Sequence, residues 1–190
     1  MNEYITEFEW NDNLRALAAY GKSLIDPATT EASYKDRFEN HLVVFNREES
    51  DPPEGITLPL KLDRLLLSCL RANSVGKIHK DGLNRNCALN IPVSNTEIGN
   101  MQWFSDEFKI NVEQYSKTVV RSIEEDEFST TVPVAYEQTI LKPSLVNTNI
   151  WHRIDNSQNT EDRYILTLRF NGNPSYKIMK TLLTSWLRTK

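Results

Sequence analysis

Three side chains of this 190-residue chain could together bind a metal ion. His79 and Asp81 form a His-x-Asp pair at the end of the run SVGKIH, and His152 ends the later run LVNTNIWH. Residues two apart in an extended segment point to the same side, so His79 and Asp81 can reach one ion above a strand end. Two imidazoles and one carboxylate form the facial ligand set of non-haem Fe(II) sites, which leaves positions open for other ligands. The sequence therefore predicts a metal site at His79, Asp81 and His152.

The remaining histidine and the two cysteines do not fit this pattern. The His-x-Asp pair alone is also compatible with a hydrogen bond that stabilises a turn, and it is the addition of His152 that favours a metal. His41 has no comparable neighbours and is expected to be a surface or hydrogen-bonded interior residue. Cys69 and Cys87 lie away from ligand spacing, so a thiolate zinc site is not expected. We expect both thiols to be buried and reduced.

A basic residue follows the distal histidine at the start of the run RYILTLRF. Arg163 shares one face of this predicted strand with Ile165, Thr167 and Arg169. An arginine that points into a protein interior needs a counter-ion, and a carboxylate can accept two hydrogen bonds from it. The distal carboxylate of 2-oxoglutarate would meet this requirement. Arg163 is the first candidate for such a contact, and Arg169 is the second.

The elements that must position these residues read as mainly β. From about residue 58 to 170, short β-rich runs are separated by Asn, Gly, Asp and Pro, as in an all-β barrel or sandwich. The run LDRLLLSCLRA also fits a buried helix, but we predict a strand because it leads directly into another strand-like run. Helices are predicted at about 10–25 and about 174–188. One domain over residues 1–190 is the expected organisation.

Three segments together resemble a known superfamily. HKDGLNRNCALNIPVSN, LVNTNIWHRIDN and DRYILTLRF are similar to the core of the Fe(II)/2-oxoglutarate-dependent dioxygenases, over about residues 65–170. The pattern is most similar to cupin-like aspartyl/asparaginyl β-hydroxylases and more distantly to prolyl hydroxylases. The resemblance implies a double-stranded β-helix, that is, a jelly-roll or cupin-like barrel. It also implies catalytic Fe(II) ligation by His79, Asp81 and His152, 2-oxoglutarate binding by Arg163, and hydroxylation with release of succinate and CO2.

The chain departs from the β-hydroxylase branch after the first ligand pair. That branch often has an Arg-x-His pattern where this chain has Ala88-Leu89-Asn90. Asn90 is then the candidate for a bond to the cosubstrate. The expected substrate, besides 2-oxoglutarate and O2, is a protein side chain or a small amino-acid-like molecule. The alternatives are a cupin-like small-ligand binding module and a metal enzyme that is not an oxygenase; Arg163 argues against the latter.

Composition and charge indicate the expected compartment and partners of the protein. Hydrophobic residues make up 39% and charged residues 25%, as in soluble globular proteins. A net charge of −4 argues against a nucleic-acid partner. The acidic start MNEYITEFEWNDN lacks the apolar run of a secretory signal, and no apolar run is long enough to span a bilayer. We expect a cytoplasmic protein without membrane contact.

Four residues near the predicted site carry more ordinary expectations. Trp103 and Phe104 are expected in the core rather than in the wall of a substrate pocket. Trp151, next to a predicted ligand, is expected to face away from the metal. Arg85 is expected to be a solvated loop arginine, with recognition of an acidic substrate as its alternative role.

Overall fold

The computed structural model of the chain describes residues 2–25, 35–38, 41–48, 52–81, 85–94, 99–105, 110–115, 118–123 and 133–188. These residues form a mainly β structure with two helices, α1 (Asp12–Ser23) and α3 (Tyr176–Arg188). Both helices lie where the sequence predicts them. Neither is long and apolar enough to cross a membrane.

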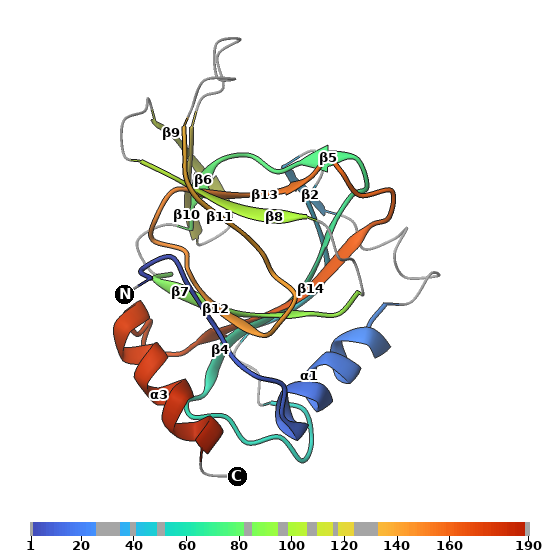
Figure 1. The fold of residues 1–190 in the computed structure, drawn as a ribbon, viewed down its shortest axis with the longest axis vertical. Helices are drawn as coiled ribbons and strands as arrows, with labels where there is room; N and C mark the ends of the chain where they lie inside the picture. The colour runs from blue at the N-terminus through green and yellow to red at the C-terminus, as the bar shows by residue number, and fades with distance from the viewer. Residues whose placement is uncertain are drawn as a thin grey trace.

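The described strands form two antiparallel sheets (Figure 1). The first has the order β1 (Ile5–Glu7), β12 (Ser144–Asn147), β7 (Cys87–Pro92), β14 (Arg163–Phe170), β4 (Leu62–Leu70), β3 (His41–Glu48) and β2 (Lys35–Phe38). The second has the order β11 (Val134–Thr139), β8 (Asn100–Phe104), β13 (His152–Asn156), β6 (His79–Lys80), β10 (Thr118–Ile123) and β9 (Ile110–Tyr115), and β5 (Ser74–Val75) pairs with β13.

The β class predicted from the sequence is confirmed, but a closed barrel is wrong. No hydrogen-bonded pair between described strands joins the two sheets, so each sheet keeps its own edge strands. The chain passes from one sheet to the other through connecting segments. The result is a pair of facing sheets rather than one continuous ladder.

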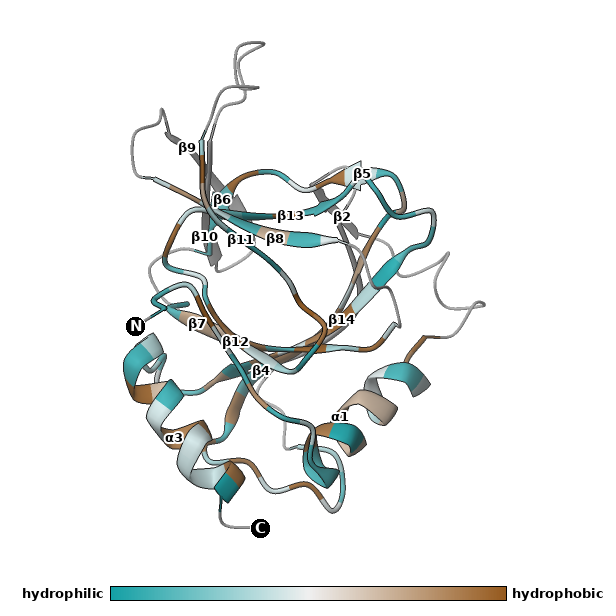
Figure 2. Cartoon of the chain, in the orientation of Figure 1, coloured by the Kyte–Doolittle hydropathy of each residue, from teal (hydrophilic) through white to brown (hydrophobic). Residues whose placement is uncertain are grey.

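Both helices cover the outer face of the first sheet (Figures 1 and 2). Leu14 and Leu17 of α1 and Met179 and Leu183 of α3 are fully buried in the cluster that joins helices to sheet. The first sheet is therefore covered on one side by helices and on the other by the second sheet. A strand buried on both faces carries an unbroken apolar run. This explains why LDRLLLSCL, which forms β4, lacks a clear alternation.

Local signals position α1 closely against the sheet. The Asn11 side chain caps the helix by accepting a hydrogen bond from the Leu14 amide at 2.9 Å, as expected for this residue type. A Cβ atom at Gly21 would lie 2.9 Å from Val93 Cγ2 and 3.2 Å from Leu166 Cβ. Glycine at this position thus lets the helix backbone approach β14.

Candidate metal centre

His79, Asp81 and His152 converge at one end of the space between the sheets. His79 opens β6, Asp81 follows that strand, and His152 opens β13 directly opposite His79. Their possible ligand atoms all lie within 4.8 Å of one another. One point therefore lies within about 2.8 Å of all three atoms, compared with metal–nitrogen bonds of about 2.0–2.2 Å. Small side-chain adjustments would place all three atoms around one ion.

The two imidazoles are oriented in the same way. His79 Nδ1 lies 2.8 Å from the Lys77 carbonyl oxygen, and His152 Nδ1 lies 2.7 Å from the Ile150 carbonyl oxygen. A carbonyl oxygen only accepts, so each Nδ1 carries the proton and the lone pair is on Nε2. The rings lie 4.5 Å apart between centroids. Hydrogen bonds of this kind fix the tautomer and ring direction of metal-binding histidines.

Asp81 is held between a guanidinium and the imidazoles. Arg169 Nη2 donates to Asp81 Oδ2, and Asp81 Oδ1 lies 3.7 Å from His79 Nε2. Burial by itself would raise the pKa of Asp81, but Arg169 and then the two histidines hold it well below its usual range. The carboxylate is therefore ionised, with one oxygen directed to the imidazoles.

His152 is kept neutral by its surroundings. Burial, and then the proximity of His79, lowers the pKa of His152 from 6.5 to about 4. A neutral imidazole and an ionised carboxylate are the forms that bind a metal. The chemistry of this donor set thus fits a divalent cation.

The three side chains open onto a cavity of about 90 Å³ between the sheets. This volume holds several water molecules or part of a compact ligand. The predicted inner face of β14 is confirmed, since Arg163, Ile165, Thr167 and Arg169 all line this cavity. The metal candidates and both candidate arginines therefore line one cavity.

Arg163 is buried in the cavity wall with neutral partners. It is 2% exposed, and it donates to the Gly99 carbonyl and, at 2.8 Å, to the Ile140 carbonyl. Burial lowers its pKa to about 10. Gly99 has φ +108°, and a Cβ there would lie 2.7 Å from Arg163 Nη1. Glycine is thus required for the close approach that positions the guanidinium.

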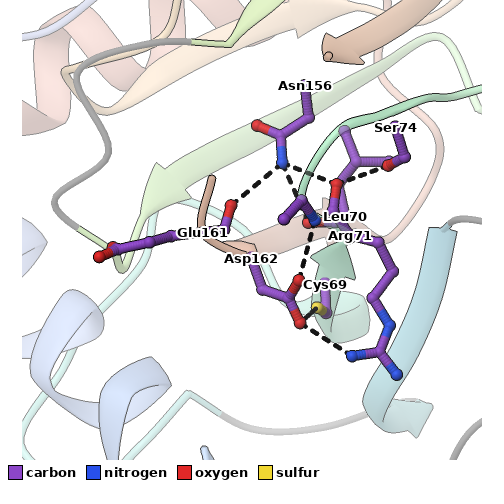
Figure 3. Close-up of polar contacts among 8 residues, drawn as sticks. Cys69, Leu70, Arg71, Ser74, Asn156, Glu161 and Asp162 are labelled. Atoms are coloured by element: carbon purple, nitrogen blue, oxygen red, sulfur yellow. Dashed lines mark hydrogen bonds and ion pairs between the residues drawn. The ribbon is translucent and has the colours of Figure 1, made fainter. Parts of the chain in front are cut away.

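The loop before Arg163 is tied to the end of β4 (Figure 3). Asp162 accepts hydrogen bonds from the Ala72 amide at 2.9 Å and from Arg71 Nη1 at 3.0 Å. Asn156 Nδ2 donates to the carbonyls of Leu70 and Arg71. These contacts fix both ends of the β13–β14 connection, and through it the position of the Arg163 backbone.

Asn90 lies in the cavity wall, as a cosubstrate contact would require. Its Oδ1 accepts a hydrogen bond from Thr167 Oγ1 at 2.9 Å, which leaves the side-chain NH2 group of Asn90 as a donor on this wall. Asn90 and Thr167 are also partners in the β7–β14 register.

The expectation of a solvated Arg85 is wrong. Arg85 is 7% exposed and lines the cavity. Its carbonyl accepts a hydrogen bond from Thr148 Oγ1 at 2.8 Å, which fixes the Arg85 backbone. The sequence signal was its position only four residues after Asp81, which favours a location near the same site.

The other nearby residues agree with their expectations. Trp103 and Phe104 are buried at 0% and 2% exposure and belong to core clusters. Trp151 packs with Ile78 and Phe104 and does not line the cavity. The His41 side chain lies outside the described residues.

Comparison with known proteins adds no relative. No protein-family model matches the chain, and no curated protein matches it. Fold and site geometry are therefore the basis for a functional assignment.

Proposed function

We propose that this chain is an Fe(II)- and 2-oxoglutarate-dependent oxygenase that hydroxylates a protein side chain or a small amino-acid-like molecule. The observation that carries the proposal is the shared cavity of His79, Asp81 and His152 with the buried Arg163. This combination offers a facial metal ligand set and an anchor for a carboxylate in one cavity.

The course of the chain supports a double-stranded β-helix as the fold. In the first sheet β4, β14, β7 and β12 are neighbours, and in the second β6, β13, β8 and β11 are neighbours. Along the sequence the chain crosses between the sheets from β6 to β7 to β8, and again from β11 through β12 and β13 to β14. Such alternation between two facing sheets is typical of jelly rolls.

Contacts of the two arginines favour Arg163 over Arg169 as the anchor for the distal carboxylate of 2-oxoglutarate. Arg169 pairs with Asp81, whereas Arg163 donates to two carbonyls and no carboxylate of the described residues pairs with it. Burial of a guanidinium without a counter-ion costs free energy, so a bound carboxylate would be stabilised more by Arg163 than by Arg169. Asn90 would donate a further hydrogen bond to the cosubstrate from its side-chain amide, since it lines the same cavity.

The residues of the chain would bind, orient and shield the reactants. His79, Asp81 and His152 would hold the metal, Arg163 would hold the far end of 2-oxoglutarate, and Leu66 and Ile154 would help to exclude water. The bound metal would supply activation of O2 coupled to decarboxylation of 2-oxoglutarate to succinate and CO2.

Succinate formation tests the proposal directly. Protein loaded anaerobically with Fe(II) and then given O2 and 2-oxoglutarate is expected to form succinate slowly without added substrate. His152→Ala is expected to abolish both metal binding and turnover. Arg163→Leu is expected to retain the metal and to weaken 2-oxoglutarate binding about tenfold or more, the loss of one charge-assisted interaction.

Arg15→Ala is the matched control, since Arg15 is exposed on α1. It should leave metal content and 2-oxoglutarate affinity unchanged. Two results would instead favour a binding module without redox chemistry. The wild-type protein would bind no stoichiometric Fe(II), or 2-oxoglutarate would not change its melting temperature. Metal binding without any response to 2-oxoglutarate would favour a metal enzyme of another kind.

A further inference from the structure

The cavity keeps excess positive charge even with the proposed cosubstrate in place. Arg163, Arg169 and a divalent metal contribute four positive charges, while Asp81 and a 2-oxoglutarate dianion contribute three negative ones. Arg85 lines the same wall. Charges in an enclosed, low-dielectric space require compensation. The cavity is therefore suited to one more anionic group.

Arg169 has donors left over for such a group. Its Nη2 donates to Asp81, but its Nε and Nη1 are buried and have no hydrogen-bond partner among the described residues. The side chain is only 10% exposed. Buried donors are almost always satisfied, and an unsatisfied one costs about 1–3 kcal/mol. Two such donors on one guanidinium point to a binding partner that completes them.

Arg85 lies beside Arg169 in the wall. Both residues line the cavity and also a smaller adjoining pocket, where the described acidic neighbour is Asp63. The Arg85 backbone is fixed by Thr148, which also binds the Asp81 amide through its carbonyl at 3.2 Å. Thr148 thus links the Arg85 backbone to Asp81, the residue that pairs with Arg169.

The two ends of the cavity hold different arginines. Arg163 is the first residue of β14 and Arg169 is the last but one. Six residues of a strand separate their Cα atoms by about 20 Å. Arg163 contacts Gly99 and Ile140, whereas Arg169 contacts Asp81. An anion at Arg163 and an anion at Arg169 therefore occupy separate positions.

We propose that Arg85 and Arg169 form a second anion subsite, which receives a carboxylate or phosphate group of the substrate. The inference rests on the proposed function, because that function assigns Arg163 to 2-oxoglutarate. It narrows the substrate to a molecule or side chain that carries an anionic group near the C–H bond to be oxidised.

Calorimetric titration with two probes, inorganic phosphate and succinate, tests the subsite. The protein is first loaded with Mn(II), which supports no turnover, and with saturating 2-oxoglutarate. We expect one equivalent of at least one probe to bind; binding of phosphate or succinate alone identifies the preferred anion. Arg85→Gln and Arg169→Lys should each weaken this binding about tenfold, as expected for a lost charge-assisted hydrogen bond. Arg15→Ala should not change it.

Each contrary result has its own meaning. If neither probe binds beside 2-oxoglutarate, or if probe binding survives both Arg85→Gln and Arg169→Lys, the subsite is refuted while 2-oxoglutarate binding stands. The same titration in metal-free protein without 2-oxoglutarate separates the two proposals. If the metal-free protein binds a probe through Arg85 and Arg169 while the protein binds 2-oxoglutarate under no condition, the result supports the subsite and refutes the oxygenase. Circular dichroism of each variant checks that it is folded. Arg85→Gln keeps the ion pair between Arg169 and Asp81, so we expect this variant to fold like the wild type.

Discussion

Arg169 and Asp81 form a buried ion pair across the end of the cavity. Their side chains are only 10% and 11% exposed, and the contact joins the last part of β14 to the residue that follows β6. The pair balances the charge of the one carboxylate in the candidate metal centre and leaves Asp81 Oδ1 directed to His79. The stability of the fold and the geometry of the site are therefore coupled through one contact.

Loss of this pair is expected to destabilise the protein strongly. Arg169→Met leaves the Asp81 charge buried without its partner, and the free energy of unfolding should fall by about 3–5 kcal/mol. Urea denaturation with EDTA present measures the change. Arg71→Met is the matched control, because the side chains of its pair with Asp162 are 49% and 26% exposed and the pair should contribute about 1 kcal/mol or less. Equal losses in the two variants would contradict the structural role of the Arg169 contact.

The stability of the metal-free protein should fall between pH 6.5 and about pH 4. The folded state lowers the pKa of His152 from 6.5 to about 4, so in this interval the unfolded chain binds a proton that the folded chain does not. The stabilisation is fully present above pH 6.5, and about 3 kcal/mol is lost as pH falls through the folded pKa. Asp81, whose pKa is also depressed, adds its loss only below its usual value of 3.8.

Urea denaturation at several pH values in EDTA measures this slope. His152→Gln should remove most of the slope between pH 6.5 and 4, because glutamine does not titrate. An unchanged slope in that variant would assign the acid sensitivity to other groups.

Gly99→Ala should weaken 2-oxoglutarate binding without removing the metal. The new Cβ would lie 2.7 Å from Arg163 Nη1, so the guanidinium must shift. Gly55→Ala imposes a similar backbone strain at φ +80°, but nothing lies within 4 Å of the new Cβ. Both variants should lose about 1–3 kcal/mol of stability. Only Gly99→Ala should lower the affinity for 2-oxoglutarate, measured by calorimetry. Equal affinities of Gly99→Ala and Gly55→Ala would show that Gly99 does not position the 2-oxoglutarate site.

Cys69 and Cys87 should be unreactive in the folded protein. Both are buried and free, and burial is the main cause that raises the pKa of each thiol to about 12. The thiolate is the reactive form, so iodoacetamide at pH 8 should label neither residue natively and both in urea. Rapid native labelling, detected by mass spectrometry, would show that one of these segments opens.

Local rules in the sequence were sufficient for the main candidates. Alternation along a strand places Arg163, Ile165, Thr167 and Arg169 on one face, and the structure has them in one cavity wall. The same rule predicted that Trp151 faces away from its neighbour His152. The helices at both ends followed from apolar spacing and, for α1, from the cap at Asn11. These features depend on residues close in sequence.

Contacts between distant segments decided the rest. The sequence left Arg163 and Arg169 as alternatives, because only the meeting of β14 with the residue after β6 shows that Arg169 pairs with Asp81. Arg85 was expected to be solvated, because contacts with remote residues such as Thr148, 63 residues away, cannot be seen in the local sequence. Whether the strands close into one barrel likewise depends on edge pairings, which alternation within a strand does not specify. Residue types and spacing thus determined which groups could do chemistry, and the tertiary structure decided which of them meet, since burial and pairing arise only when remote segments pack together.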